Sequence, residues 1–150
     1  IDGTYTSASP LTITSAQGVS GVALQCDNAT VIDGNVPPEF TNGMWFNNKL
    51  QAVNNKDRFV TEIRFKAKTT VNNDVFEMDL NIGGGLGVIR TQSFIFTKSA
   101  NTEQSFARPI HYFTGGTFVS NGGELIIRGN TGTLSIYDME IVPTRVHKGY

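Results

Sequence analysis

Apolar and polar side chains alternate along two neighbouring segments, residues 59–68 and 75–82. Within most of each segment every second residue is apolar, and the residues between them are mostly charged or polar. A period of two is typical of a strand that buries one face and leaves the other in water. The sequence therefore predicts two strands here, each with one buried face.

The two strands are predicted to form a hairpin across the polar turn at residues 69–74. Opposite charges then face each other across the strands, and sliding the pairing by two residues would instead place Glu62 opposite Asp79. Directly opposed like charges destabilise a sheet, so the charges favour the register that places opposite charges across from each other. Its pairs are Lys68–Val75, Lys66–Glu77, Phe65–Met78, Arg64–Asp79 and Ile63–Leu80.

Short strand-like runs bounded by Gly, Asn and Pro continue along the rest of the chain. Asn47-Asn48 is expected to turn a second hairpin, because asparagine tolerates the positive φ of a tight turn. Pro109 places its strand at a sheet edge or a bulge. The last strand is expected to contain a bulge, with Met139 or Ile141 inward after it, and to end at Pro143. The further strand-like runs are residues 11–14, 22–26, 44–46, 49–53, 88–96, 105–113, 117–119, 124–128 and 133–142.

Nine or ten short strands at a spacing of 8 to 12 residues, with no substantial helix, indicate a sandwich or barrel. We predict an all-β, antiparallel β-sandwich of jelly-roll type, because the early connections are long enough to cross between sheets while the late ones are tight. Residues 11–143 form this single domain. Residues 1–10 are expected to be an extended arm, and residues 144–150 an exposed basic tail.

Composition narrows the classes of partner. Lys and Arg number 12 and Asp and Glu 13, so the sequence offers no basic stripe for phosphates and argues against nucleic acid as a direct partner. No apolar run approaches the roughly 20 residues that span a bilayer, so no membrane partner is predicted. Cys26 is the single cysteine, and we expect it to be a small buried apolar residue rather than a nucleophile.

The nucleophilic, acidic, histidine and glycine-rich positions in the sequence do not form a pattern typical of a catalytic, cofactor or metal site. Glycines 83–87 precede a strand rather than a helix, so we interpret them as a turn and not a phosphate cradle. His111 and His147 sit in no nucleophile motif and are expected to be solvated, at the core rim or in the tail. Oxygen atoms of residues 27–28 and 33–35 would suit one surface cation, but turn formation explains the same residues equally well.

Two acidic pairs have the spacing that places both carboxylates on one face of a strand, as in β-sandwich glycosidases. Glu77 and Asp79 have predicted cross-strand bases, which makes them a solvated ion-pair lattice. Asp138 and Glu140 lack an obvious partner and are kept as candidate binding residues. We therefore predict a protein that is not an enzyme.

Aromatic side chains are the stronger candidates for a ligand face. Trp45, Tyr112 and Tyr137, with Phe113, would offer flat rings to a sugar. The alternative is that Trp45 and Phe113 belong to the core. Residues 28–30 match a glycosylation acceptor, a pattern that also arises by chance.

The last third of the chain resembles jelly-roll domains of tailed-bacteriophage virion proteins, such as capsid decoration, head-fibre and tail-fibre modules. The residues that carry the resemblance are 113–118, 121–127 and 135–141. The closing Ile-x-Asp-x-x-Ile pattern after a glycine-rich turn is also similar to the last strand of carbohydrate-binding modules. The first resemblance implies symmetric assembly without catalysis, and the second implies a sugar-binding face.

These observations predict a non-enzymatic virion structural protein that is located in the virion. Its predicted partners are further copies of itself, as in a homotrimer, and other virion proteins such as the major capsid protein. A host glycan is a further candidate partner. The alternative function is a carbohydrate-binding module, and a glycan-cleaving enzyme would require two facing carboxylates in a cleft.

Overall fold

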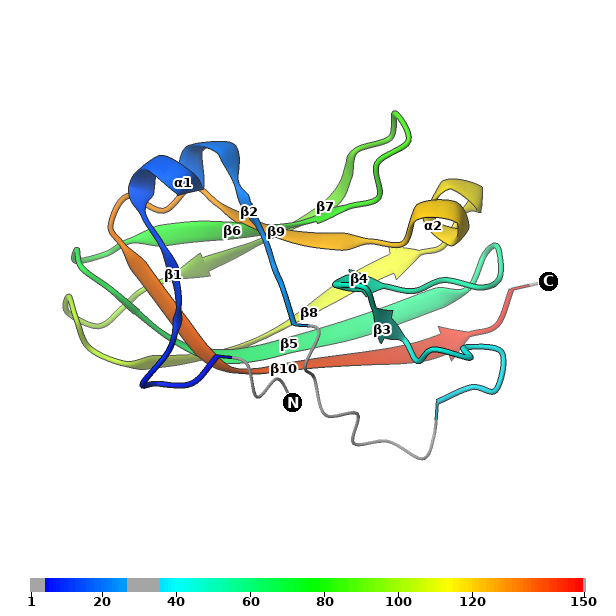
Figure 1. Cartoon of the computed structure of the whole chain (residues 1–150), viewed down its shortest axis with the longest axis horizontal. Coiled ribbons are helices and arrows are strands. Elements are labelled where there is room, and N and C mark those ends of the chain that lie inside the picture. The colour runs from blue at the N-terminus through cyan, green and yellow to red at the C-terminus, as the bar shows by residue number, and fades with distance from the viewer. Residues whose placement is uncertain (1–4, 27–35, 150) are drawn as a thin grey trace.

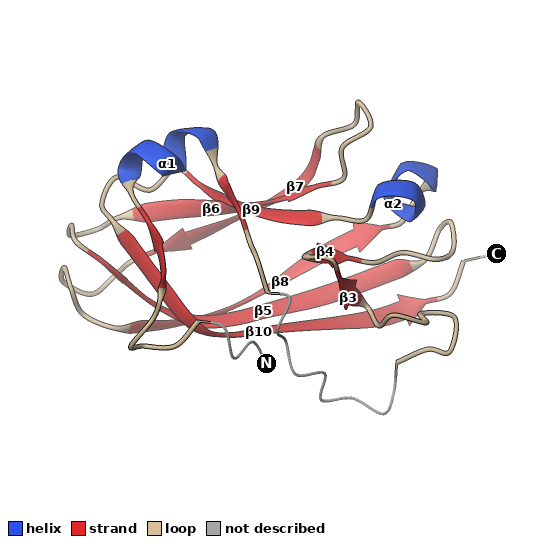
Figure 2. Ribbon diagram, in the orientation of Figure 1, coloured by secondary structure: helices blue, strands red, loops and turns tan. Residues whose placement is uncertain are grey.

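A computed structural model describes residues 5–26 and 36–149, which form an all-β antiparallel sandwich (Figure 1). Two four-stranded sheets pack together beside a two-stranded hairpin, and two helices of six residues lie near opposite ends (Figure 2). The strands are β1 (Leu11–Ile13), β2 (Val22–Ala23), β3 (Trp45–Phe46), β4 (Lys49–Leu50), β5 (Arg58–Thr69), β6 (Val75–Asn81), β7 (Val88–Ile95), β8 (Gln104–Phe113), β9 (Glu124–Arg128) and β10 (Leu134–His147). The helices are α1 (Ser15–Ser20) and α2 (Gly116–Asn121). The predicted sandwich and its number of strands are confirmed.

The strand order is β1-β10-β5-β8 in one sheet and β2-β9-β6-β7 in the other. The pairs nest along the chain, because β1 lies beside β10, β2 beside β9, β5 beside β8 and β6 beside β7. Among these eight strands only β6 and β7 are consecutive neighbours in one sheet. Every other connection passes from one sheet to the other, so both sheets are built from the whole length of the chain.

The predicted hairpin between residues 59–68 and 75–82 is wrong, because β5 and β6 belong to different sheets. β5 pairs with β10 and β8, whereas β6 pairs with β9 and β7. The turn between them crosses the sandwich, and Phe65 and Phe76 meet in the core with their ring centroids 5.9 Å apart. The alternation of apolar and polar residues predicts which face of each strand is buried, but it does not predict which strand pairs with it.

Aromatic rings from both sheets fill one end of the core. Five phenylalanines are in mutual contact there, with centroid separations from 5.0 to 6.1 Å. They are Phe65, Phe76, Phe94, Phe96 and Phe106. Cys26 is buried as predicted. The sandwich is held together chiefly by this apolar interior.

Three local predictions are confirmed. Asn47 and Asn48, with φ of 51° and 59°, turn the β3–β4 hairpin. Pro109 lies in β8, which is an edge strand. β10 shifts register between Tyr137 and Glu140, and there Asp138 has a φ of 50°. The bulge buries Met139, one of the two residues predicted to point inward.

Residues 117–119 form part of α2 and not the predicted strand. Gly122, with a φ of 70°, ends the helix by donating its N–H to the carbonyl of Phe118. The Phe118 ring is buried and stacks on Tyr112 at 5.2 Å. The five residues between the glycine pairs include only two apolar ones, Phe118 and Val119, which is too few to show a period.

The segment before β2 also differs from prediction. Residues 15–20 form α1, which Thr14 and Gln17 begin with a capping box. This Thr-x-x-Gln pattern is a recognised start signal that the strand-based interpretation missed. The predicted strand at 22–26 is shortened to β2. No helix in the described residues is long and apolar enough to cross a membrane.

The final strand does not end at Pro143 but continues to His147. β1 covers β10 only along Leu134–Ile136, so farther on one side of β10 is an edge, where proline is tolerated. Residues 144 and 146–148 are exposed, as predicted for the tail, but β10 continues through this segment as far as His147. Arg145 is largely shielded and Gly149 is buried.

Candidate functional site

Tyr112, one of the predicted ring residues, lies in the core. Its side chain on β8 is 1% exposed and stacks between Phe59 and Phe118, at 5.5 and 5.2 Å. Its hydroxyl forms a 2.9 Å hydrogen bond with that of Thr61, and burial raises the pKa of the Tyr112 phenol. Tyr112 therefore has no face to offer to a sugar.

Tyr137 and Trp45 do not complete the predicted platform. Tyr137 is 2% exposed, and its hydroxyl donates to Glu103 at 2.6 Å. Burial, together with Glu103, raises the pKa of Tyr137 to about 12. Trp45 is half-buried against the core on the separate β3–β4 hairpin. With Tyr112 and Tyr137 buried, these three rings do not form an exposed face.

The expectation that Asp138 and Glu140 lack a partner is also wrong. Lys66 Nζ lies 3.0 Å from Asp138 Oδ2, and Arg64 contacts Glu140 at 3.4 Å. The hydrogen bond that Lys66 donates to Asp138 raises the pKa of Lys66. These partners come from β5, which lies beside β10 although some 70 residues separate the two segments. Local sequence holds no signal for that pairing.

The other acidic pair is held by a base that the sequence interpretation did not choose. Arg128 on β9 contacts Glu77 and Asp79, each at 2.5 Å, where Arg64 and Lys66 were predicted. Asp79 is buried and also accepts a hydrogen bond from Thr91. Burial would raise the pKa of Asp79, but Arg128 and Thr91 together hold it below its ordinary value. Neither acidic pair is available as a free acid and base.

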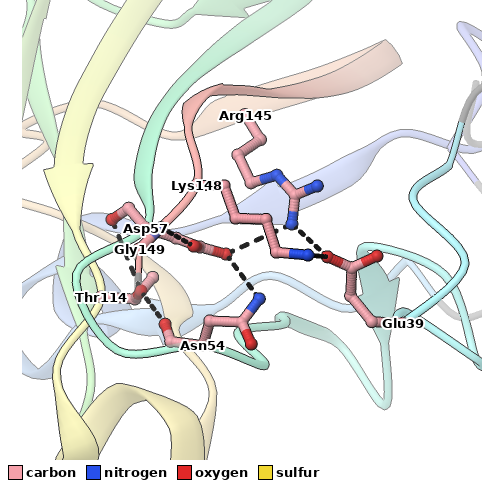
Figure 3. A network of polar contacts seen from close by, with 7 residues as sticks. All are labelled: Glu39, Asn54, Asp57, Thr114, Arg145, Lys148 and Gly149. Carbon is pink, nitrogen blue, oxygen red and sulfur yellow. Dashed lines mark hydrogen bonds and ion pairs between the residues drawn. The ribbon is translucent and has the colours of Figure 1, made fainter.

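A polar network fastens the end of the described chain to the loop before β5 (Figure 3). The buried Asp57 accepts from the backbone N–H of Gly149 at 2.6 Å and from Asn54 at 3.4 Å. Arg145 lies between two carboxylates, at 3.5 Å from Asp57 and 2.5 Å from Glu39. We call these residues the C-terminal clamp. Because its carboxylates are neutralised by partners, the clamp positions chain segments and leaves no reactive acid.

Close packing at Gly149 shows how tightly the clamp fits. A Cβ atom at this residue would lie 1.8 Å from the carbonyl oxygen of Asn55, so only glycine allows this approach. Thr114 supports the same loop by donating to the carbonyl of Asn54 at 2.5 Å. The clamp joins segments distant in sequence, and no local pattern predicts it.

The contacts of the C-terminal clamp lower the pKa of Glu39. The hydrogen bond from Arg145 is the main reason that the pKa of Glu39 falls from 4.5 to about 2. Since the folded value is the lower one, the stabilisation is present above about pH 4.5 and is lost as the pH falls toward 2. In Arg145→Met we expect the Glu39 midpoint to return toward 4.5 in a carboxyl-carbon NMR titration.

Lys148→Met is the matched control for that titration. Lys148 lies 3.5 Å from Glu39 and is far more exposed than Arg145, so its loss should move the midpoint much less. An unchanged Glu39 midpoint in Arg145→Met would contradict the assigned cause.

The outer face of the β1-β10-β5-β8 sheet has a charged part and an apolar part. Around Arg64 and Lys66 the charges are paired within the face. Toward the Arg58 end of β5, exposed apolar side chains join this face from β8 and β10, with Glu62 between Pro109 and Val142 and Arg58 beside Phe113. Their exposed fractions are 59% for Phe113, 42% for Val142 and 52% for Val146, and Arg58 lies 5.6 Å from the centroid of the Phe113 ring. We call Val60, Pro109, Phe113, Val142 and Val146 the apolar end.

A second surface feature is a polar hollow of about 490 Å³ beside α2. Its walls are Lys49 on β4, residues 81–84 at the end of β6 and in the turn after it, residues 120–122 at the end of α2, and Glu124 on β9. The glycines predicted to form a turn do so here, and a strand follows them. None of the ligand residues predicted from sequence lines this hollow.

The remaining predicted residues do not assemble into a site. His111 is exposed on the edge strand β8 and His147 on β10. Within residues 5–26 and 36–149, no three His, Cys, Asp or Glu residues are grouped as metal ligands. The oxygen-rich segments 27–28 and 33–35 and the glycosylation pattern at 28–30 lie outside the described residues.

No family model, no curated protein and no solved structure matches the chain.

Proposed function

We propose that this protein is a non-enzymatic structural component of a virion, of the capsid-decoration or fibre type of tailed phages. It acts by assembling with copies of itself or by docking on a capsid. The resemblance of residues 113–141 supports the virion, and the nested strand order supports a jelly roll, a fold of eight strands in two Greek keys.

The observation that carries the assembly part is the apolar end. Exposed apolar residues that gather on one surface, rimmed by polar ones, are typical of protein–protein contact. Here the rim includes the ion pairs of Arg64 and Lys66 on the same sheet face. A partner that covers the apolar end also covers Arg58, whose guanidinium lies over Phe113, so the partner should offer that charge a hydrogen-bond acceptor.

Particles made by the genome that encodes this chain provide the test of the virion part. Gradient-purified particles should contain peptides of this protein beside those of the major capsid protein, in a fixed ratio. Recovery of the chain only from the particle-free fraction would overturn the proposal.

Substitutions at the apolar end test assembly in solution. We expect the purified chain to show the mass of two or three copies by light scattering, and Phe113→Asp to shift it to the mass of one, because burying that carboxylate opposes contact. Val19→Asp is the matched control, since Val19 is 84% exposed on α1 and lies outside the apolar end. A wild-type mass of one copy at all concentrations would contradict self-assembly.

A carbohydrate-binding module is the second candidate function. The observation that favours it is the polar hollow beside α2 rather than the aromatic platform predicted from sequence. The two candidates use different surfaces, so one protein can serve both.

A further inference from the structure

Two asparagine side chains in the hollow are each fixed at one end and free at the other. Asn81 Oδ1 accepts the N–H of Gly83 at 2.8 Å, and Asn121 Nδ2 donates to the carbonyl of Ile82 at 2.9 Å. No described residue pairs with Asn81 Nδ2 or with Asn121 Oδ1. The fixed ends set which way each amide points, so the hollow holds one oriented donor and one oriented acceptor.

The charged groups of the hollow are balanced and loosely paired. Lys49 Nζ lies 3.7 Å from Glu124 Oε1, beyond the usual hydrogen-bond range. Both groups therefore keep the capacity to bond to a ligand, and the hydroxyl of Ser120 adds a group that both donates and accepts. A hollow with no net charge and alternating donors and acceptors favours neither an anion nor a cation.

Two glycines, Gly84 and Gly122, contribute backbone but no side chain to the walls of the hollow. A Cβ at Gly84 would lie 2.7 Å from Thr117 Cγ2, and one at Gly122 would lie 3.0 Å from the carbonyl oxygen of Leu50. Both glycines also have positive φ, at 57° and 70°. Close packing and positive φ therefore favour glycine at these two positions in the wall.

We propose that this hollow binds one unit of a neutral sugar. Each sugar hydroxyl both donates and accepts, so neighbouring hydroxyls match the free Asn81 donor and the free Asn121 acceptor. The volume of about 490 Å³ lies within the range of small-molecule sites, roughly 300–1,000 Å³. The inference rests on the second candidate function, to which it adds a site and a class of ligand.

Amide NMR shifts during titration with neutral methyl glycosides test the site. We expect glucose, galactose, mannose or N-acetylglucosamine glycosides to shift the backbone amides of Gly83, Gly84 and Gly122, with dissociation constants on the order of 1–10 mM. Glu124→Gln should weaken that binding about tenfold, as expected for one lost hydrogen bond to a charged group. Ser120→Phe, at an exposed position on the rim, should abolish binding while leaving the other amide signals in place.

Asp138→Asn is the matched control, because it breaks a lysine–carboxylate pair of the same kind on the other sheet. It should leave the sugar shifts unchanged. Amide shifts confined to another surface would contradict the hollow as the binding site but would still support carbohydrate binding. No shift anywhere with the four glycosides would overturn both, and neither result bears on assembly through the apolar end.

Discussion

Replacing Asp74 with alanine is expected to lower the free energy of unfolding by about 3–5 kcal/mol. The carboxylate is buried and accepts five hydrogen bonds from described residues. Three of the donors are backbone N–H groups, those of Val75, Thr131 and Gly132. Without the carboxylate these N–H groups, of which that of Gly132 is buried and the other two are partly buried, lose their acceptor. Each buried group left unpaired costs on the order of 1–3 kcal/mol. Urea denaturation at pH 7 measures the loss.

Asp138→Asn is a control of known geometry, because Asp138 forms only an exposed ion pair with Lys66. Asp138→Asn should lower the free energy of unfolding by less than about 1 kcal/mol. Asp74→Asn, which keeps the shape but turns an amide toward donors, should cost about 2–3 kcal/mol. Equal stability of Asp74→Asn and wild type would show that the carboxylate does not hold the two turns together.

The effect of Asp74 should depend on pH. Burial would raise the pKa of its carboxyl, but hydrogen bonds from Thr69, Thr131 and Gly132 outweigh burial and keep that pKa below its ordinary value. A lowered folded value means that the stabilisation is complete above about pH 4 and is lost as the pH falls further. The stability difference between wild type and Asp74→Asn should therefore shrink in acid.

The turn at Asp74 also shows why the sequence predicts which face of a strand is buried better than it predicts which strands pair. Alternation correctly assigns Phe65 and Phe76 to buried faces, since each face is a property of a single strand. The turn that holds Asp74, however, carries the chain between sheets, and its partners lie in the β9–β10 turn. Charge matching did not correct the error, because Arg128 satisfies Asp79 as well as Arg64 would have done.

The candidate sites were less predictable than the fold. Whether a ring such as Tyr112 is exposed depends on α2, whose Phe118 covers it, and the sequence predicts a strand there. The hollow left a clearer local signal, because Asn121 stands directly before Gly122 and Asn81 directly before the glycine-rich turn that begins after Ile82. That signal predicts each turn separately, and only the folded topology brings the two turns together.

Phe76→Ala should cost about 3–5 kcal/mol, because it removes a fully buried ring and leaves a cavity. Phe76 packs against four other rings, including a stacked contact with Phe94 at 5.0 Å, so neighbours from both sheets lose contacts. A domain with a total stability of roughly 5–15 kcal/mol would then be close to unfolding. Thermal and urea denaturation measure the change.

Phe46→Ala makes the same substitution at a partly exposed position of the β3–β4 hairpin and should cost much less, within about 1 kcal/mol. Should Phe76→Ala fail to fold, Phe76→Leu keeps part of the volume and is expected to cost about 1–3 kcal/mol. If instead Phe76→Ala and Phe46→Ala were equally stable, the five rings could not form the contact that joins the two sheets. β5 and β6 belong to different sheets and meet across the core at Phe65 and Phe76, so the loss at Phe76 measures how much this contact between the sheets stabilises the sandwich.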